Sequence, residues 1–183
     1  MMNGLATQLL GYPTSGYIKV FTDPEGASLV EKNDMAFTTL LYAADPELWK
    51  PHLGAEGGLR RFLESGEPVP TASWISAEEL DTHSRIIKGG YREVFAWYRA
   101  WLEMGPAEED AAVPAEERKI SVPTLLVIAE KDYAVIPDMH AHMTKEAAAD
   151  LQVERLPVGH WIMLEATEEL NKLLEGFVAR VQG

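Results

Sequence analysis

A largely apolar segment in the last third of the chain limits what this protein can fold into. Residues 122–129 read VPTLLVIA, are rich in branched aliphatic side chains, and end at a charged turn over 130–132. Strands without polar alternation are typical of parallel sheets, which are buried on both faces. We therefore expect residues 122–129 to form a buried strand.

The segments that follow predict how this strand is partnered. We expect a helix from Pro137 to about Ala149, an alternating strand over 151–156, a loop over 157–160 and an amphipathic helix over 167–181. This order predicts a right-handed parallel βαβ unit. Two strands cannot cover both faces and both edges of residues 124–129. The first strand should therefore come from the middle of a larger sheet whose other strands are not in this chain.

Residues before 118 have a different pattern, with short helices cut by Pro and Gly and no convincing strand. Helices are predicted over 26–44, 46–49, 59–65, 76–88 and 91–104, the last as one aromatic helix. Residues 105–118 are rich in Glu, Ala and Pro and predict a surface linker. The predicted organisation is a helical region over 1–104, this linker, and an α/β segment over 119–183.

Charge and composition exclude several classes of protein. The formal net charge is −13, with acidic residues in excess in both halves, whereas nucleic acids and anionic membranes require a basic surface. There is no cysteine, so disulfides, thiol chemistry and Cys-ligated metals are excluded. No segment approaches the length of a membrane span and neither end carries a targeting signal, so we expect a cytoplasmic protein.

Two residues at the ends of the predicted strands could carry chemistry. Asp132 follows the first strand and His160 follows the second. Ligands of open α/β sheets bind at the carboxyl ends of strands, and an acid and a histidine on neighbouring strand ends form the orienting and basic half of a hydrolytic triad. The alternative is structural, with Asp132 as a turn former and His160 as a loop residue.

Several motifs resemble one enzyme family. ISVPTLLVIAEKDY at 120–133, followed by Gly-His-Trp at 159–161, resembles the C-terminal part of the soluble epoxide hydrolases of the α/β-hydrolase superfamily. GYIKVFTDPEG at 16–26 and GYREVFAWYR at 90–99 resemble their helical cap. The resemblance covers nearly all of the chain. It implies a partial α/β-hydrolase fold, a mostly helical cap (lid) followed by a C-terminal parallel βαβα core segment.

The resemblance assigns roles to four residues. It implies that Asp132 is the charge-relay acid and His160 the general base. It also implies that Tyr17 and Tyr98 are cap tyrosines, which donate hydrogen bonds to the epoxide oxygen and act as acid when the ring opens. A phenol suits this step because its pKa of about 10 keeps it protonated at neutral pH. Without the family pattern, Tyr98 would be a core aromatic and Tyr17 a turn or packing residue.

The chain also departs from the family. The attacking Asp of these enzymes lies in a G-x-Asp-x-G elbow and part of their oxyanion hole in a His-Gly-x-Pro loop, and neither motif occurs here. The expected protein is therefore truncated, or pairs with a missing core half. Two alternatives remain: a non-covalent enzyme that activates water through Asp132 and His160, and an inactive binding or self-association module that forms a homo-oligomer.

An apolar pocket without metal or cofactor is expected around the site. The residues predicted to line it are Phe95, Trp97, Trp101, Val135, Trp161 and Met163. Such a pocket favours a small lipophilic epoxide as substrate. His140 and His142 form an H-x-H pair, but side chains two positions apart on a helix point in different directions and would not share a metal. No Gly-rich phosphate loop occurs in the sequence.

Overall fold

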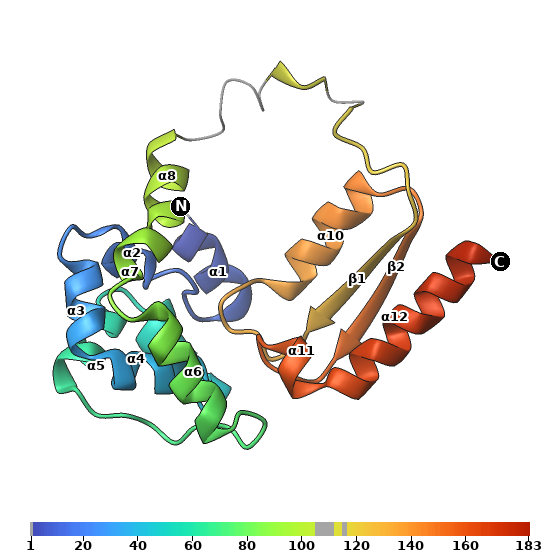
Figure 1. The fold of residues 1–183 in the computed structure, drawn as a ribbon. Coiled ribbons are helices and arrows are strands. Elements are labelled where there is room, and N and C mark those ends of the chain that lie inside the picture. The colour runs from blue at the N-terminus through green and yellow to red at the C-terminus, as the bar shows by residue number, and fades with distance from the viewer. Residues whose placement is uncertain (1, 105–111, 115–116) are drawn as a thin grey trace. The chain divides into compact units, whose positions relative to one another are not determined.

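The structure, a computed structural model, describes residues 2–104, 112–114 and 117–183. The chain divides into two units, Met1–Pro106 (unit 1) and Ala107–Gly183 (unit 2), both shown in Figure 1. The predicted linker over 105–118 falls mostly on residues outside those described. Within the described ranges, no helix combines the length and apolarity that crossing a membrane requires.

Unit 1 is built from short helices. Its described part contains no strand and only one isolated antiparallel bridge, between Ala43 and Thr71. The α-helices are α1 Met2–Leu10, α2 Ile18–Thr22, α3 Gly26–Lys32, α4 Asp34–Leu41, α5 Gly58–Ser65, α6 Ala77–Ile87, α7 Tyr91–Val94 and α8 Ala96–Met104. A 3₁₀ helix, η1 Pro46–Leu48, and a π-helical turn, η2 Lys50–Gly54, lie between α4 and α5.

Local capping signals set several of these helix ends. The Asp45 carboxylate accepts the backbone N–H of Glu47 at the start of η1. Ser76 and Glu79 form a complete capping box at the start of α6. Gly66 ends α5 in the left-handed region, with φ of 68°, a conformation that glycine adopts without steric cost.

Two predicted helices are each divided in the structure. The helix expected over 26–44 is α3 and α4, which are separated at Asn33, where the backbone leaves helical geometry. The helix expected over 91–104 is α7 and α8, which are separated at Phe95. Phe95 is 1% exposed and its ring stacks on that of Phe21 at 4.0 Å between centroids. The interruption therefore coincides with the anchoring of an aromatic side chain in the core of unit 1.

Unit 2 is a parallel βαβ unit, as predicted, followed by two helices where one was predicted. Its elements are β1 Thr124–Ala129, α10 Pro137–Ala147, β2 Leu151–Leu156, α11 Ile162–Glu165 and α12 Thr167–Gln182. The strands pair in register from Thr124 with Leu151 to Ala129 with Leu156. The predicted second strand has the observed bounds, whereas the short helix α11 was not predicted.

The first strand is less buried than its apolar sequence predicts. Of β1, only Ile128 and Ala129 are buried, and the four residues before them are half-buried. The sheet has two strands within the described residues, so the remaining residues of β1 have too few neighbours to exclude water. Helix α10 also ends earlier than predicted, because Ala148 turns extended and forms a parallel bridge with Ile120.

Candidate functional site

The ends of the two strands bring Asp132 and His160 together. The parallel pairing continues beyond the strands, since Glu130 N–H donates to the Leu156 carbonyl and Lys131 N–H to the Val158 carbonyl, both at 2.9 Å. The segments that follow β1 and β2 therefore run side by side as far as Asp132. This backbone pairing places an acid and a histidine that are distant in sequence on the same edge of the sheet.

The two side chains form a direct hydrogen bond. His160 Nδ1 lies 2.8 Å from Asp132 Oδ2, and the other carboxylate oxygen, Oδ1, accepts the Ala134 N–H at 2.9 Å. Asp132 is 9% exposed, whereas the His160 side chain is 39% exposed. A carboxylate at Nδ1 favours the tautomer that carries its proton there and leaves Nε2 as the basic nitrogen. The pair therefore has the geometry of an orienting acid and a solvent-accessible base.

In unit 1 the structure brings the two predicted tyrosines together. Tyr17 precedes α2 and Tyr98 lies on α8, and their rings meet edge to face with centroids 5.8 Å apart. Both rings also contact Phe21, at 5.1 and 4.9 Å. The hydroxyl-bearing side chains are half-buried, so they are neither core residues nor fully exposed ones.

The backbone at Tyr17 is held by the last residues of η2. Tyr17 N–H donates to the Leu53 carbonyl at 2.7 Å, and Gly16 N–H donates to the Gly54 carbonyl at 2.8 Å. A Cβ on Gly16 would lie 2.3 Å from the Ala55 carbonyl oxygen, so only glycine permits this approach. The preceding glycine therefore allows the backbone contact that fixes the start of α2 and the position of Tyr17.

The residues predicted to line the pocket have different environments. In unit 1, Phe95 is a core residue, while Trp97 and Trp101 are 83% and 51% exposed. In unit 2, Val135 and Trp161 are half-buried and Met163 is exposed. The Trp161 ring meets the His160 ring edge to face at 5.0 Å, which brings one predicted lining residue to the Asp132–His160 pair.

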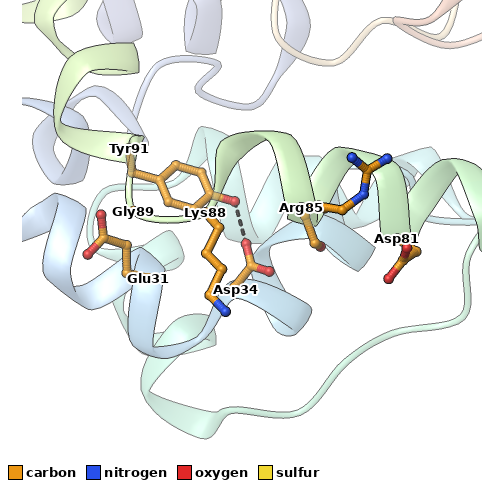
Figure 2. Close-up of a pocket in the computed structure, with 8 residues that line it drawn as sticks. Glu31, Asp34, Asp81, Arg85, Lys88, Gly89 and Tyr91 are labelled. Atoms are coloured by element: carbon orange, nitrogen blue, oxygen red, sulfur yellow. Dashed lines mark hydrogen bonds between the residues drawn. The ribbon is translucent and has the colours of Figure 1, made fainter.

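A pocket in unit 1 was not predicted from the sequence (Figure 2). It has a volume of about 620 Å³ and contains none of the predicted site residues. Two residues that line it are hydrogen-bonded, since Tyr91 O–H donates to Asp34 Oδ1 at 2.6 Å. Burial, followed by this contact with Asp34, raises the pKa of Tyr91 well above its ordinary value of 10.0. The lining residues are Glu31, Asp34, Asp81, Ser84, Arg85, Lys88, Gly89 and Tyr91.

One contact beside the histidine was also missed. The Glu165 carboxylate accepts the backbone N–H groups of Gly159 and Trp161, at 2.6 and 3.0 Å. An acid that follows a loop by a few residues and reaches back to its N–H groups is a variant of helix N-capping. The spacing of Glu165 after Trp161 was therefore the available signal.

The described residues contain no group of three or more His, Asp or Glu side chains arranged to hold a metal ion. Of the two histidines in the H-x-H pair, His142 lies 3.4 Å from the Glu146 carboxylate, one turn along α10. This contact joins neighbouring exposed side chains of one helix.

No protein-family model matches the chain. Epoxide hydrolase srdG from Neurospora crassa is 29% identical over 114 residues, which are 61% of this chain and 33% of that protein. Bifunctional epoxide hydrolase 2 from Sus scrofa is 26% identical over 166 residues, 88% of this chain and 29% of that protein. The solved structure of epoxide hydrolase A from Mycobacterium thermoresistibile has a TM-score of 0.68 at 23% identity, and covers 96% of this chain and 56% of that one.

These comparisons confirm the resemblance to epoxide hydrolases of the α/β-hydrolase superfamily over most of the chain. They also confirm the predicted fold class, a mostly helical region followed by a small parallel sheet. The chain spans 33% and 29% of the two curated relatives and 56% of the solved structure. It therefore corresponds to part of the fold of these proteins.

Proposed function

We propose that this chain supplies the acid and the base with which an α/β-hydrolase opens a small lipophilic epoxide to a diol. Tyr17 and Tyr98 donate hydrogen bonds to the epoxide oxygen, and His160, oriented by Asp132, is the general base. The observation that carries the proposal is the 2.8 Å contact between His160 Nδ1 and Asp132 Oδ2. The names of the curated relatives support the choice of an epoxide as substrate.

The chemistry requires both residue pairs. When the strained C–O bond breaks, its oxygen becomes negatively charged, and a hydrogen bond from a neutral phenol stabilises that charge until a proton is transferred. In the second half of the reaction a water molecule attacks the ester formed with the attacking carboxylate, releases the diol and restores the carboxylate. This water loses a proton as it attacks, and Nε2 of His160 accepts it. The Asp132 carboxylate then stabilises the imidazolium without itself being protonated.

The attacking carboxylate comes, in this proposal, from outside the 183 residues. None of the chain's aspartates lies in a G-x-Asp-x-G sequence. Asp132 is engaged by His160 and by the Ala134 N–H, so both of its oxygens have partners and it is poorly placed to attack a substrate. The relatives are longer than this chain, which leaves room for a nucleophile in the part it does not match.

Binding of styrene oxide to the purified chain tests the acid half of the proposal. Tyr17→Phe and Tyr98→Phe should each weaken binding about fivefold, the value of one neutral hydrogen bond, while the matched control Tyr12→Phe should not. Intrinsic tryptophan fluorescence gives the dissociation constants. Binding that ignores both tyrosines, or no binding, would contradict the proposal.

Diol release under the same conditions separates the two routes of attack. A second candidate route, in which His160 activates water directly, is favoured by the partial exposure of its side chain. That route requires diol release by the chain alone, lost in His160→Gln and kept in the exposed control His142→Gln. In a single turnover in heavy-oxygen water, the new oxygen should then come from solvent. Binding without diol release supports attack by a carboxylate from outside the chain.

A further inference from the structure

One carboxylate holds the backbone on both sides of His160. Glu165 Oε2 accepts the Gly159 N–H at 2.6 Å, and Glu165 Oε1 accepts the Trp161 N–H at 3.0 Å. The half-buried Glu165 is the last residue of α11, the short helix that begins directly after Trp161. Because both flanking N–H groups bind one carboxylate, the movement of the His160 Cα between them is restricted.

The neighbouring glycine makes this contact possible. A Cβ on Gly159 would lie 2.8 Å from Glu165 Oε1 and 3.2 Å from Oε2, closer than side chains normally approach. The φ of Gly159 is not positive, so its backbone conformation does not itself require glycine. The absence of a side chain at residue 159 therefore serves the approach of Glu165.

The position of the His160 ring depends on this loop. The backbone pairing that aligns the two strand ends stops at Val158, two residues before the histidine. Beyond that point, the Gly159 and Trp161 N–H groups donate to the Glu165 carboxylate, and the Trp161 carbonyl accepts the N–H groups of Leu164 and Glu165, both at 2.8 Å. A hydrogen bond such as that from Nδ1 to Asp132 weakens steeply as its angle and distance depart from the ideal, so a looser loop would populate it less.

We propose that Glu165 is the positioning residue for the general base, acting through the backbone rather than on substrate. This inference rests on the proposed function of His160 and adds a residue that none of the family motifs indicated. Glu165 binds the backbone on both sides of the histidine and so fixes the loop in the position in which Nδ1 meets Asp132.

The test is the solvent-exchange rate of the His160 Nδ1 proton, measured by NMR on the intact chain labelled with ¹⁵N. Glu165→Gln keeps the size of the side chain, but one of its two oxygens becomes an NH₂ group that cannot accept a hydrogen bond. We expect the exchange rate to rise about tenfold, in proportion to the loss of one hydrogen bond to a charged group. The matched control Glu168→Gln, at an exposed site in the first turn of α12, should leave the rate unchanged.

Gly159→Ala tests the same contact from the other side. Its Cβ displaces the Glu165 carboxylate, so exchange should rise as in Glu165→Gln, and the double variant should show less than the product of the two effects because both remove one interaction. Amide protection at Val127, inside β1, reports whether unit 2 remains folded.

Two results would overturn the inference. The first is an unchanged Nδ1 exchange rate in Glu165→Gln. The second is a raised exchange rate accompanied by loss of amide protection at Val127, which would mean that Glu165 contributes to the general stability of unit 2. Neither result bears on the proposed function. That function fails instead if a protein that contains this chain and turns over an epoxide keeps its turnover rate in the His160→Gln variant.

Discussion

At the scale of single residues, the pairing of Asp132 with His160 has the most direct chemical consequence. Asp132→Asn keeps the shape of the side chain but can present an N–H donor to Nδ1, which favours the opposite tautomer of His160. We expect ¹⁵N imidazole spectra to show the proton on Nε2. In any protein that contains this chain and turns over an epoxide, Asp132→Asn should lower the turnover rate at least about a thousandfold.

A matched variant separates tautomer from charge. Asp138→Asn removes an exposed carboxylate near the start of α10, whose partner is Arg155, and should change neither the spectrum nor turnover. An Asp132→Asn protein that retains the Nδ1–H tautomer would contradict the orienting role of Asp132.

Tyr91 gives unit 1 a dependence on alkaline pH. Its side chain is 2% exposed and its O–H donates to Asp34, which together raise the pKa in the folded state above the unfolded value of 10.0. A pKa that is higher in the folded state adds to the free energy of unfolding, and this contribution is complete below pH 10. It is lost as pH rises through the folded-state pKa, because the tyrosine of the unfolded chain ionises at lower pH than that of the folded chain. Burial also raises the pKa of Tyr42, so the two tyrosines act in the same direction.

Tyr91→Phe should therefore change stability in a pH-dependent way. At pH 7 we expect the free energy of unfolding to fall by about 1–3 kcal/mol, because Asp34 loses its donor. Between pH 10 and 12 the difference from the original chain should narrow by up to about 1.4 kcal/mol per pH unit. Urea unfolding followed by circular dichroism measures both, and parallel curves for the two proteins would contradict the role of Tyr91.

At the scale of elements, α2 and the start of α3 approach each other closely. A Cβ on Gly26 would lie 1.7 Å from the Val20 carbonyl oxygen, so Gly26→Ala must separate the two helices. We expect it to destabilise unit 1 by about 3 kcal/mol or more, within the range of severe overpacking. Gly4→Ala is the control, because nothing lies within 4 Å of that position and the midpoint of urea unfolding should not fall.

The capping box of α6 offers a milder perturbation. Ser76→Ala removes the side chain that accepts the Glu79 N–H and should cost about 1 kcal/mol. Ser84→Ala, within the same helix, should cost nothing or stabilise slightly, because alanine has the higher helix propensity. Equal effects of the two substitutions would show that the cap contributes nothing specific.

These elements also show how far local patterns reach. The start of α6 and the bounds of β2 were predicted, because each depends on hydrogen bonds or periodicity within a few residues. The parallel pairing of the strands was predicted from the order strand, helix, strand. The divisions at Asn33 and Phe95 and the short helix α11 were not predicted. Phe95 packs on Phe21, far away in sequence, and no local pattern reports that contact.

At the scale of the whole chain, the small sheet leaves apolar surface on unit 2. The exposed branched residues there include Ile120, Val122, Val153, Leu164 and Val178. Exposed apolar surface and unpaired strand edges promote association. The homo-oligomer expected from the sequence therefore stays a prediction that sedimentation velocity can check.

Val153→Lys places a charge on the exposed side of β2 and should shift the chain towards monomer at tens of micromolar concentration, about the range in which weak interfaces associate. Gln182→Lys adds the same charge at the exposed end of α12 and should have no such effect. A chain that is monomeric at all concentrations would contradict self-association and favour the two enzyme hypotheses.

Some features of the candidate site were predicted from the sequence, and others required the tertiary structure. The sequence by itself determined that Asp132 and His160 would be neighbours, because the carboxyl ends of adjacent parallel strands lie on one edge of a sheet. Family motifs indicated Tyr17 and Tyr98, and their contact at 5.8 Å was visible only in the structure. The apolar residues expected around the site differ widely in burial, because composition does not say which face of an element meets a neighbour.

Only the tertiary structure identified what holds the histidine. Glu165 lies in none of the family motifs. We inferred its role from its carboxylate, which accepts two backbone N–H groups. The apolar segment over 122–129 likewise determined a strand, while the number of strands beside it decided how much of that strand is buried. Periodicity and capping act within one element, whereas burial and positioning depend on which distant residues supply the neighbouring atoms.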